Sequence, residues 1–252
     1  MLAEERRLQL VAFARSEGRV DASEAATRLK VAVETIRRDL EILQRQGVMR
    51  RVHGGGILVD RIQSEYSVSI RRTQNSEIKN RIAEVAAQYI PSTGTIIVDA
   101  GTTTEFLAPY LRDKSGLTVV TNSLNLSLAI GESSTHVILI GGKMRPITLS
   151  TVGTLAVSMI SEVFASVSFL ATNGIDPQAG FTTPDIEEAE VKRLMIKNSQ
   201  ESIVLADSSK FGQRFGTRFA SLDQVDRLVT DMSAPSQSLD ALKSHEIEVV
   251  LA

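Results

Sequence analysis

Seven short apolar runs in the second part of the chain most constrain what this sequence can fold into. They are TIIVD, LTVVTN, HVILIGG, VSFLATN, SIVLADS, RLVTD and EVVLA, and the first begins at Thr95. Most are followed by a helical pattern, over residues 106–111, 124–130, 155–163, 187–196 and 239–242. Apolar runs that alternate with amphipathic helices are typical of a largely parallel sheet with helices on its faces. We therefore predict a Rossmann-like α/β domain over residues 77–252.

The loops that follow these runs form the candidate binding site, because open α/β sheets bind ligands beyond the carboxyl ends of their strands. Five loops offer glycine backbone, hydroxyl, amide or cationic groups. Their candidate residues are Asp99, Gly101, Thr102, Thr103, Thr104, Thr121, Asn122, Ser123, Gly141, Gly142, Arg145, Asn173 and Lys210. The alternative is structural, since Asp, Asn and Thr at strand ends also cap helices and form turns. Five such loops together favour a ligand site.

The chemistry of these loops suits a compact phosphorylated sugar. In DAGTTT, residues 99–104, the glycine lets the backbone come close, and the threonine amides and hydroxyls can meet an anion at a helix N-terminus. The loop is neither a Walker loop nor G-x-G-x-x-G, so a nucleotide is not implied. Arg145 and Lys210 can neutralise a phosphate, while Asp99 and Asn122 can bind sugar hydroxyls. Lys192 is a further candidate, with a solvated helix face as its alternative.

The first 62 residues are the basic part of a chain whose total charge is −2, with 12 Lys and Arg against 9 Asp and Glu. Only KVA separates a second and a third helical pattern, as a helix-turn-helix requires. The stretch VMRRVHGGGILV follows them and predicts a hairpin. The three expected buried stripes are Leu8, Val11, Ala12 and Arg15; Ala22, Ala25, Ala26 and Leu29; and Ile36, Leu40 and Leu43. We predict a winged helix-turn-helix domain over residues 1–59.

The third helix of this domain turns a polar, basic face away from its apolar stripe. In a winged helix-turn-helix, that face enters the major groove of double-stranded DNA, and the hairpin lies along phosphates or in the minor groove. The candidate DNA-binding residues are Glu34, Thr35, Arg37, Arg38, Arg50, Arg51 and His53. The alternative is that the arginines coat a solvated face, and that His53 shapes the turn before the glycines.

The sequence does not indicate a disulfide-linked, metal-binding, secreted or membrane-spanning protein. The chain has no cysteine, which excludes disulfides and thiolate metal sites, and its histidines lack the spacing of a metal site. We therefore expect no metal and no cofactor. The charged start MLAEERRLQLVAF is unlike a signal peptide, and no run approaches the roughly 20 residues of a membrane span. We expect a cytoplasmic protein without membrane contact, in which the polar residues 60–76 link the two domains.

The stretch TIRRDLEILQRQGVMRRVHGGG, Thr35 to Gly56, resembles the signature of the DeoR family of bacterial transcriptional repressors. In that family, a recognition helix with T-x-R-R-D-L precedes R-x-H-G-G-x. Two positions depart from the pattern: Lys30 stands where the family usually has the turn glycine, and Ala32 where it usually has a serine or threonine N-cap. A lost cap typically costs about 1 kcal/mol. These departures concern the stability and start of the helix rather than DNA contact.

The resemblance continues through DAGTTT, TNS, GGxxR, TVGT with Gly153, TNGI, EAEVK with Lys192 and ADSSKFG, in the order seen in DeoR-type sensor domains. That fold is similar to ribose-5-phosphate isomerase, glucosamine-6-phosphate deaminase and coenzyme A transferases. The resemblance implies a non-catalytic pocket for a phosphorylated sugar effector.

Two functions are therefore compared. The first is a DNA-binding regulator, most often a repressor of carbohydrate genes in this family, which acts as a homodimer or homotetramer. The second is an isomerase or deaminase with Asp99 or Glu190 as general base and Lys210 as electrostatic partner. The N-terminal module favours the regulator, because such an enzyme would not need it.

Overall fold

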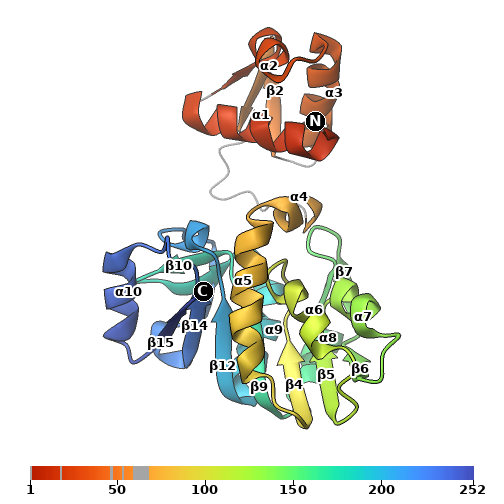
Figure 1. Cartoon of the computed structure of the whole chain (residues 1–252), viewed down its shortest axis with the longest axis vertical. Coiled ribbons are helices and arrows are strands. Elements are labelled where there is room, and N and C mark those ends of the chain that lie inside the picture. Colours follow the sequence, from red (N-terminus) through yellow and green to blue (C-terminus); the bar gives the residue numbers. More distant parts are fainter. Residues whose placement is uncertain (1, 18, 46–47, 53, 59–67) are drawn as a thin grey trace. The chain divides into compact units, whose positions relative to one another are not determined.

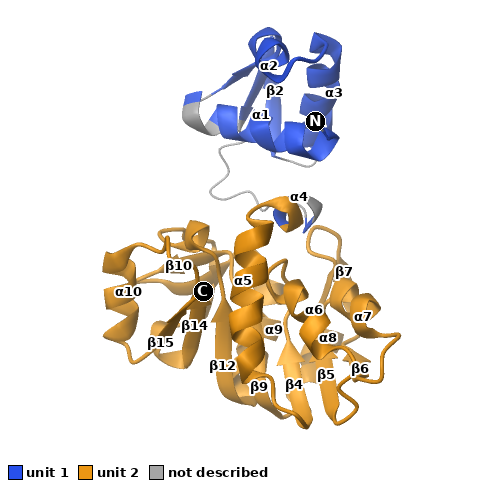
Figure 2. Ribbon diagram, viewed as in Figure 1, with its two compact units in different colours: residues 1–71 blue, residues 72–252 orange. Residues whose placement is uncertain are grey.

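The computed structural model describes residues 2–17, 19–45, 48–52, 54–58 and 68–252. The chain divides into two compact units, residues 1–71 and 72–252 (Figure 2). Each unit is described by itself. Helix α4 (Val68–Thr73) spans the division, and residues 60–67 of the expected linker lie outside the described residues.

The first unit combines three helices with a small antiparallel sheet of strand order β1-β3-β2 (Figure 1). Strands β2 and β3 form the hairpin, with Met49 opposite Leu58. The elements are α1 (Ala3–Glu17), β1 (Val20–Asp21), α2 (Ala22–Leu29), α3 (Val33–Arg45), β2 (Met49–Val52) and β3 (Gly55–Leu58). This confirms the winged helix-turn-helix architecture.

Two of the three expected stripes are buried as predicted, those of α2 and α3. The stripe of α1 was correct in part: Val11 is buried and Leu8 packs against the core, whereas Ala12 is exposed and Leu10 and Ala14 are buried in its place. Leu10 and Ala14 lie one helical turn apart on the same side as Val11. Arg6 and Arg7 near the start of α1 form ion pairs with the buried Asp39 of α3.

The turn between α2 and α3 shows the effect of both unusual residues. Lys30 follows α2 in the left-handed conformation, with φ 52° and ψ 46°, which is the conformation that glycine adopts most readily. Ala32 directly precedes α3 and its carbonyl accepts a bond from the Thr35 N–H at 2.9 Å, but its side chain has no oxygen to cap the helix. Helix α2, in contrast, is capped by Asp21.

Lys30→Gly is therefore expected to stabilise the first unit by about 0.5–1 kcal/mol, because glycine adopts positive φ without the steric cost borne by other residues. The measurement is hydrogen exchange of the α2 and α3 amides in the full-length protein. Lys30→Ala is the matched control, since it also removes the side chain but keeps the Cβ atom. Equal protection in the two variants would contradict the strain argument.

The second unit is built on a seven-stranded parallel sheet of order β15-β14-β12-β9-β4-β5-β6 (Figure 1). All seven apolar runs form its strands, as predicted. The strands are β4 (Gly94–Val98), β5 (Leu117–Thr121), β6 (His136–Leu139), β9 (Ala165–Ala171), β12 (Ser199–Leu205), β14 (Arg227–Thr230) and β15 (Glu248–Leu251). The strand order reverses between β4 and β9, so the topological switch point lies there.

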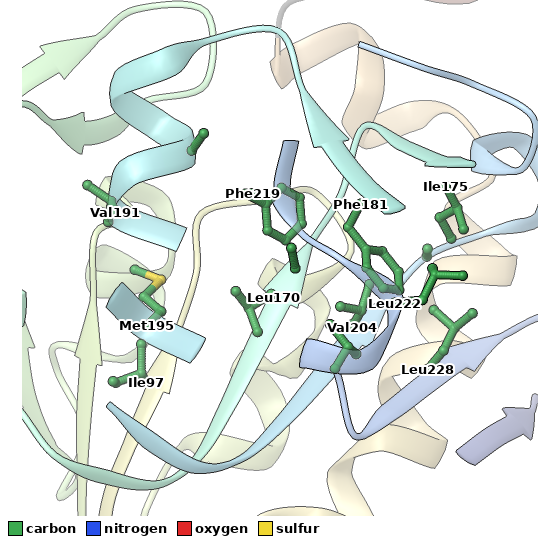
Figure 3. Packing of buried hydrophobic residues seen from close by; sticks show 14 of the residues in the cluster. Ile97, Leu170, Ile175, Phe181, Val191, Met195, Val204, Phe219, Leu222 and Leu228 are labelled. Carbon is green, nitrogen blue, oxygen red and sulfur yellow. The ribbon is translucent and has the colours of Figure 1, made fainter. Parts of the chain in front are cut away.

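Helices cover both faces of the sheet. The helical elements are α5 (Ser76–Ala86), η1 (Ala87–Tyr89), η2 (Thr104–Leu107), α6 (Ala108–Leu111), α7 (Leu124–Ile130), α8 (Thr154–Ser161), α9 (Ile186–Lys197), η3 (Ser208–Lys210), η4 (Leu222–Gln224) and α10 (Ser236–Lys243). Alternate residues of one strand face the two cores: Ile97 packs with Met195 of α9, whereas Ile96 and Val98 pack with Ile82 of α5. Figure 3 shows the first core around Leu170, Phe181 and Val204.

Two small antiparallel sheets accompany the large one and were not predicted. They are β7 (Lys143–Arg145) with β8 (Ser150–Val152), and β10 (Gly174–Asp176) with β11 (Gly180–Thr183) and β13 (Thr217–Ala220). Their strands have three or four residues each, too few to show an alternating pattern. Among the described helices, none has the length and apolar character needed to cross a membrane.

Candidate functional site

The outer face of α3 carries the candidate DNA-binding side chains of the helix. Glu34, Arg37 and Arg38 are exposed, and Thr35 is half-buried. Glu34 and Arg37 form an ion pair at 3.2 Å, one helical turn apart on the surface. The acid of the T-x-R-R-D-L motif, Asp39, does not lie on this exposed face. It is buried and binds Arg6 of α1. The helix therefore separates a solvent-facing basic side from an acidic anchor in the core.

The hairpin holds the other candidate arginines. Arg50 and Arg51 are exposed on β2, opposite Ile57 and Gly56 of β3. Glycine is required at position 55, where β3 pairs with β1, since a Cβ atom on Gly55 would lie 1.8 Å from the carbonyl oxygen of Val20. His53 lies outside the described residues.

In the second unit, a buried ion pair lies at the switch point of the sheet. Asp99 follows β4 and Lys192 belongs to α9; both are buried, and their side chains are in direct hydrogen-bond contact. Lys192 also donates to the carbonyl of Ala171 at the end of β9, at 2.9 Å, and the Ala171 N–H donates to Asp99 Oδ2 at 3.1 Å. The pair therefore joins the ends of the two strands between which the sheet reverses.

The two carboxylate oxygens of Asp99 differ in their hydrogen bonds. Asp99 is 1% exposed, and its Oδ1 is buried without a hydrogen bond among the described residues. Leaving a buried polar atom unpaired usually costs about 1–3 kcal/mol, and a charged group costs more. Such an oxygen is suited to accept a hydrogen bond from a ligand hydroxyl.

A second cation, Arg145, is linked to Lys192 by acids at the start of α9. Arg145 of β7 binds Glu188 and Asp185 at 3.0 Å each, and Glu188 in turn lies 3.5 Å from Lys192 Nζ. Burial raises the pKa of Asp185, but the Glu188 N–H and Arg145 outweigh it, so the net pKa is below the usual value. Asp185 therefore remains ionised at neutral pH.

Two further cations, Lys210 and Lys79, act electrostatically on Asp207, which follows β12. Burial raises the pKa of Asp207. The charges of Lys210 and Lys79 and the hydrogen bonds from Ser209 lower it by more, so the net pKa is below the usual value. Lys79 of α5 is 2% exposed, and its Nζ donates to Thr102 Oγ1 at 3.1 Å. The loop after β4 is thus connected to the loop after β12 through a buried lysine.

Several candidate residues hold the loops together by contacts within the protein. The Thr104 hydroxyl bonds the carbonyls of Asp99 and Gly101 at 2.7 and 2.9 Å, and Thr121 donates to the Val98 carbonyl at 2.6 Å. Ser123 caps α7. These hydroxyls were predicted to contact a ligand. In the structure they form hydrogen bonds that hold the chain at the ends of β4 and β5.

Other candidates also contact their neighbours. Asn122 Oδ1 accepts from the Ala100 N–H at 2.8 Å, and Asn173 accepts from Thr183 Oγ1 at 3.2 Å. A Cβ atom on Gly101 would lie 2.2 Å from Ala171 Cβ, so this glycine is needed for packing of β4 on β9.

The remaining candidates are Thr103, Gly141, Gly142 and Gly153. Thr103 is buried, while Gly141 and Gly142 are exposed after β6. Gly153 precedes α8 with φ +86°, a conformation that favours glycine.

Protein-family models of one family match both parts of the chain. The model of the DeoR-like helix-turn-helix domain matches residues 6–62, and that of the DeoR C terminal sensor domain matches residues 74–232. The chain belongs to the DeoR family of transcriptional regulators. Its DNA-binding domain precedes its sensor domain.

Relatives of this DeoR-family chain match along nearly its whole length. The HTH-type transcriptional regulator GlpR of Haloferax volcanii is 32% identical over 250 residues, 99% of this chain and 98% of the relative. The glycerol-3-phosphate regulon repressor of Escherichia coli K12 is 32% identical over 244 residues, 96% of each chain. Among solved structures, ribose 5-phosphate isomerase A of Neisseria gonorrhoeae aligns with 57% of each chain, at 19% identity and a TM-score of 0.40.

One acid assigned to the enzyme alternative is misplaced for that role. Glu190 is exposed on α9, whereas Glu188, two residues earlier, is 3% exposed and faces Lys192 and Arg145. The helix places residues 188 and 192 one turn apart on the inner side, and residue 190 on the outer side. In this DeoR-family regulator the acid of α9 that faces the site is therefore Glu188.

Sequence reasoning also missed Lys79 and Asp207. Lys79 has a signal in the sequence: with Ile82, Ala83 and Ala86 it completes an i, i+3, i+4, i+7 stripe that α5 buries. A lysine on such a stripe is unusual, because lysine is almost never fully buried without a partner. Asp207 had no comparable signal, since acids after strands commonly cap the next turn, as Asp207 does for η3.

Proposed function

We propose that this protein binds operator DNA and represses carbohydrate genes, and that a phosphorylated sugar bound in the sensor domain controls its affinity for the operator. The observation that carries the proposal is the set of charged groups around the switch point. Lys192 binds Asp99, whose Oδ1 is buried without a hydrogen bond among the described residues, and Arg145 binds the acids Asp185 and Glu188. Lys79 and Lys210 act on Asp207 after the neighbouring strand β12. A ligand with a phosphate at one end and hydroxyls at the other is complementary to both features.

The DNA side of the proposal uses the basic face of α3 and the hairpin. Glu34, Thr35, Arg37 and Arg38 would contact bases and phosphates in the major groove, and Arg50, Arg51 and His53 would lie along the backbone or in the minor groove. A homodimer or homotetramer would present paired recognition helices to repeated half-sites. The protein would act in the cytoplasm, where it meets its operator.

The names of the relatives support this function over catalysis. One is a regulon repressor whose printed name refers to glycerol 3-phosphate, and another is a transcriptional regulator. We do not favour the isomerase or deaminase, because Glu190 is exposed and Asp99 is held by Lys192. A thermal-shift screen with sugar phosphates tests the assignment: ligand-induced stabilisation without product would support it. Turnover at ordinary enzyme rates would refute it.

Lys210→Ala is expected to weaken binding of the stabilising sugar phosphate about tenfold or more, since a hydrogen bond to a charged group contributes about 1.5–3 kcal/mol. Operator affinity without ligand should remain within twofold, because Lys210 lies in the sensor domain. Calorimetry measures the first quantity and fluorescence anisotropy the second. Lys243→Ala, an exposed lysine of α10, is the matched control. Wild-type ligand affinity in Lys210→Ala would remove this residue from the site.

A further inference from the structure

The segment that begins the sensor domain contacts the candidate effector site at three points. Arg72 Nη2 donates to Glu105 Oε2 at 2.6 Å, Asn75 Nδ2 to Asp207 Oδ1 at 3.2 Å, and Lys79 Nζ to Thr102 Oγ1 at 3.1 Å. These partners belong to the loops after β4 and β12 or to η2, which directly follows the first loop. Residues 72–79 are therefore attached to the same loops that an effector would bind.

Lys79 is a buried cation next to the loop after β4 rather than a surface charge. It is buried beside the apolar residues Ile82 and Ala83, and burying an ammonium group requires strong partners. Its hydrogen bond to Thr102 is to a neutral hydroxyl, and its charge also acts on Asp207. A phosphate oxygen is a stronger partner for an ammonium group than a hydroxyl is, because both partners are then charged.

A phosphate at this position would also act on Asp207. The Asp207 carboxylate shares Lys210 and Lys79 with any anion bound there, and a doubly charged phosphate would compete for both cations and repel the carboxylate. The same carboxylate holds the Asn75 side chain. Phosphate binding at Lys79 would therefore weaken the attachment of Asn75.

Asn75 is a sensitive point in the backbone. It precedes α5 with φ 54°, its side chain makes no capping bond to the helix, and its carbonyl accepts the Lys79 N–H at 2.9 Å. A left-handed conformation is sterically unfavourable for a non-glycine residue, with asparagine among the tolerant types. The bond to Asp207 helps to hold this conformation between α4 and α5.

We propose that the first turn of α5 senses the effector, with Lys79 as a phosphate-binding residue and Asn75, through Asp207, as the residue that passes occupancy to the preceding chain. This inference rests on the proposed function and deepens it. A ligand can change operator affinity only through differential affinity for two states of the protein. The two states here are α5 with its Asn75 end attached to Asp207 and α5 with that end released.

The binding part is tested with Lys79→Met in the full-length protein. Inorganic phosphate, glycerol 3-phosphate, glucose 6-phosphate, fructose 1-phosphate and ribose 5-phosphate are titrated by calorimetry. The variant should fold, because methionine fills a similar volume beside the apolar stripe, and should bind the phosphate compounds that bind wild type at least tenfold more weakly. Arg81→Met, on the exposed side of α5, is the matched control and should bind as wild type does. Unchanged affinity in Lys79→Met would overturn the assignment.

The coupling part is tested with Asn75→Gly, which removes the amide but suits the positive φ. Its affinity for the best phosphate compound should stay within about threefold of wild type, while the ligand-dependent change in DNA affinity falls to less than a third of the wild-type factor. The DNA is selected by the wild-type protein from a random library. Ligand should increase hydrogen exchange of residues 72–79 in wild type and in the control Asn80→Ala, but not in Asn75→Gly.

The outcomes separate this inference from the function on which it rests. A full DNA response in Asn75→Gly, or an exchange pattern at residues 72–79 that ligand leaves unchanged in wild type, would overturn the coupling while leaving a sugar-phosphate regulator intact. Wild-type protein that binds none of the compounds, or whose DNA affinity none of them changes, would refute the proposed effector function, and this inference with it.

Discussion

Lys192→Met is expected to lower the free energy of unfolding of the sensor domain by about 3–5 kcal/mol, the range found when one partner of a buried ion pair is removed. Asp99 would keep its bond from the Ala171 N–H but lose the cation that balances its charge. Urea unfolding followed by tyrosine fluorescence measures the change, because two of the three tyrosines, Tyr89 and Tyr110, lie in the second unit.

The double variant Asp99→Asn with Lys192→Met separates stability from binding. Removing both charges should recover most of the lost stability, since replacing a whole buried pair is often nearly neutral. Sugar-phosphate binding should nevertheless be lost in the double variant, because it has neither the Lys192 ammonium group nor the Asp99 carboxylate. A double variant that binds the ligand normally would show that the pair is structural only.

The double variant Arg37→Ala with Arg38→Ala is expected to reduce operator affinity about a hundredfold and to lower the salt dependence of binding. Each arginine that contacts a phosphate adds nearly one unit to the slope of log affinity against log salt, and each that binds a base edge contributes about 1–3 kcal/mol. Anisotropy titrations at several salt concentrations measure both quantities.

Arg45→Ala is the matched control for that experiment. Arg45 is also an exposed arginine of α3, but it belongs to the last turn and pairs with Glu41 at 3.1 Å. Its loss should change operator affinity less than threefold. If the Arg37 and Arg38 variant kept both the affinity and the salt slope of wild type, the basic face of α3 would not be the DNA-binding surface.

The large sheet could be predicted from sequence because a strand buried on both faces leaves a continuous apolar run. TIIVD and SIVLADS are examples, and Ile97 and Val204 indeed face one core while Ile96 and Ile203 face the other. The ion pairs of α1 could not be predicted in the same way. Arg6 and Arg7 contact Asp39, a residue more than 30 positions away in the sequence.

The sequence indicates where a ligand site is expected, but not which side chains contact one another there. The rule that ligands bind beyond the strand ends led to Asp99, Lys210 and the loops between them. Which groups are available and which close a loop depends on side-chain geometry: Asp99 Oδ1 has no hydrogen bond among the described residues, whereas the Thr121 hydroxyl donates to Val98. The ion pair that Glu188 forms with Arg145 joins residues 43 positions apart, which the sequence pattern of one helix does not show.

The central claim is that a ligand in the sensor domain changes the affinity of the helix-turn-helix domain for its operator. The most direct test is to titrate selected operator DNA with the full-length protein in the presence of each sugar phosphate, and to recover the ligand afterwards for mass spectrometry. We predict that at least one compound changes operator affinity tenfold or more and is recovered unchanged. DNA affinity that no sugar phosphate alters, or a ligand converted to product at enzyme-like rates, would contradict the claim.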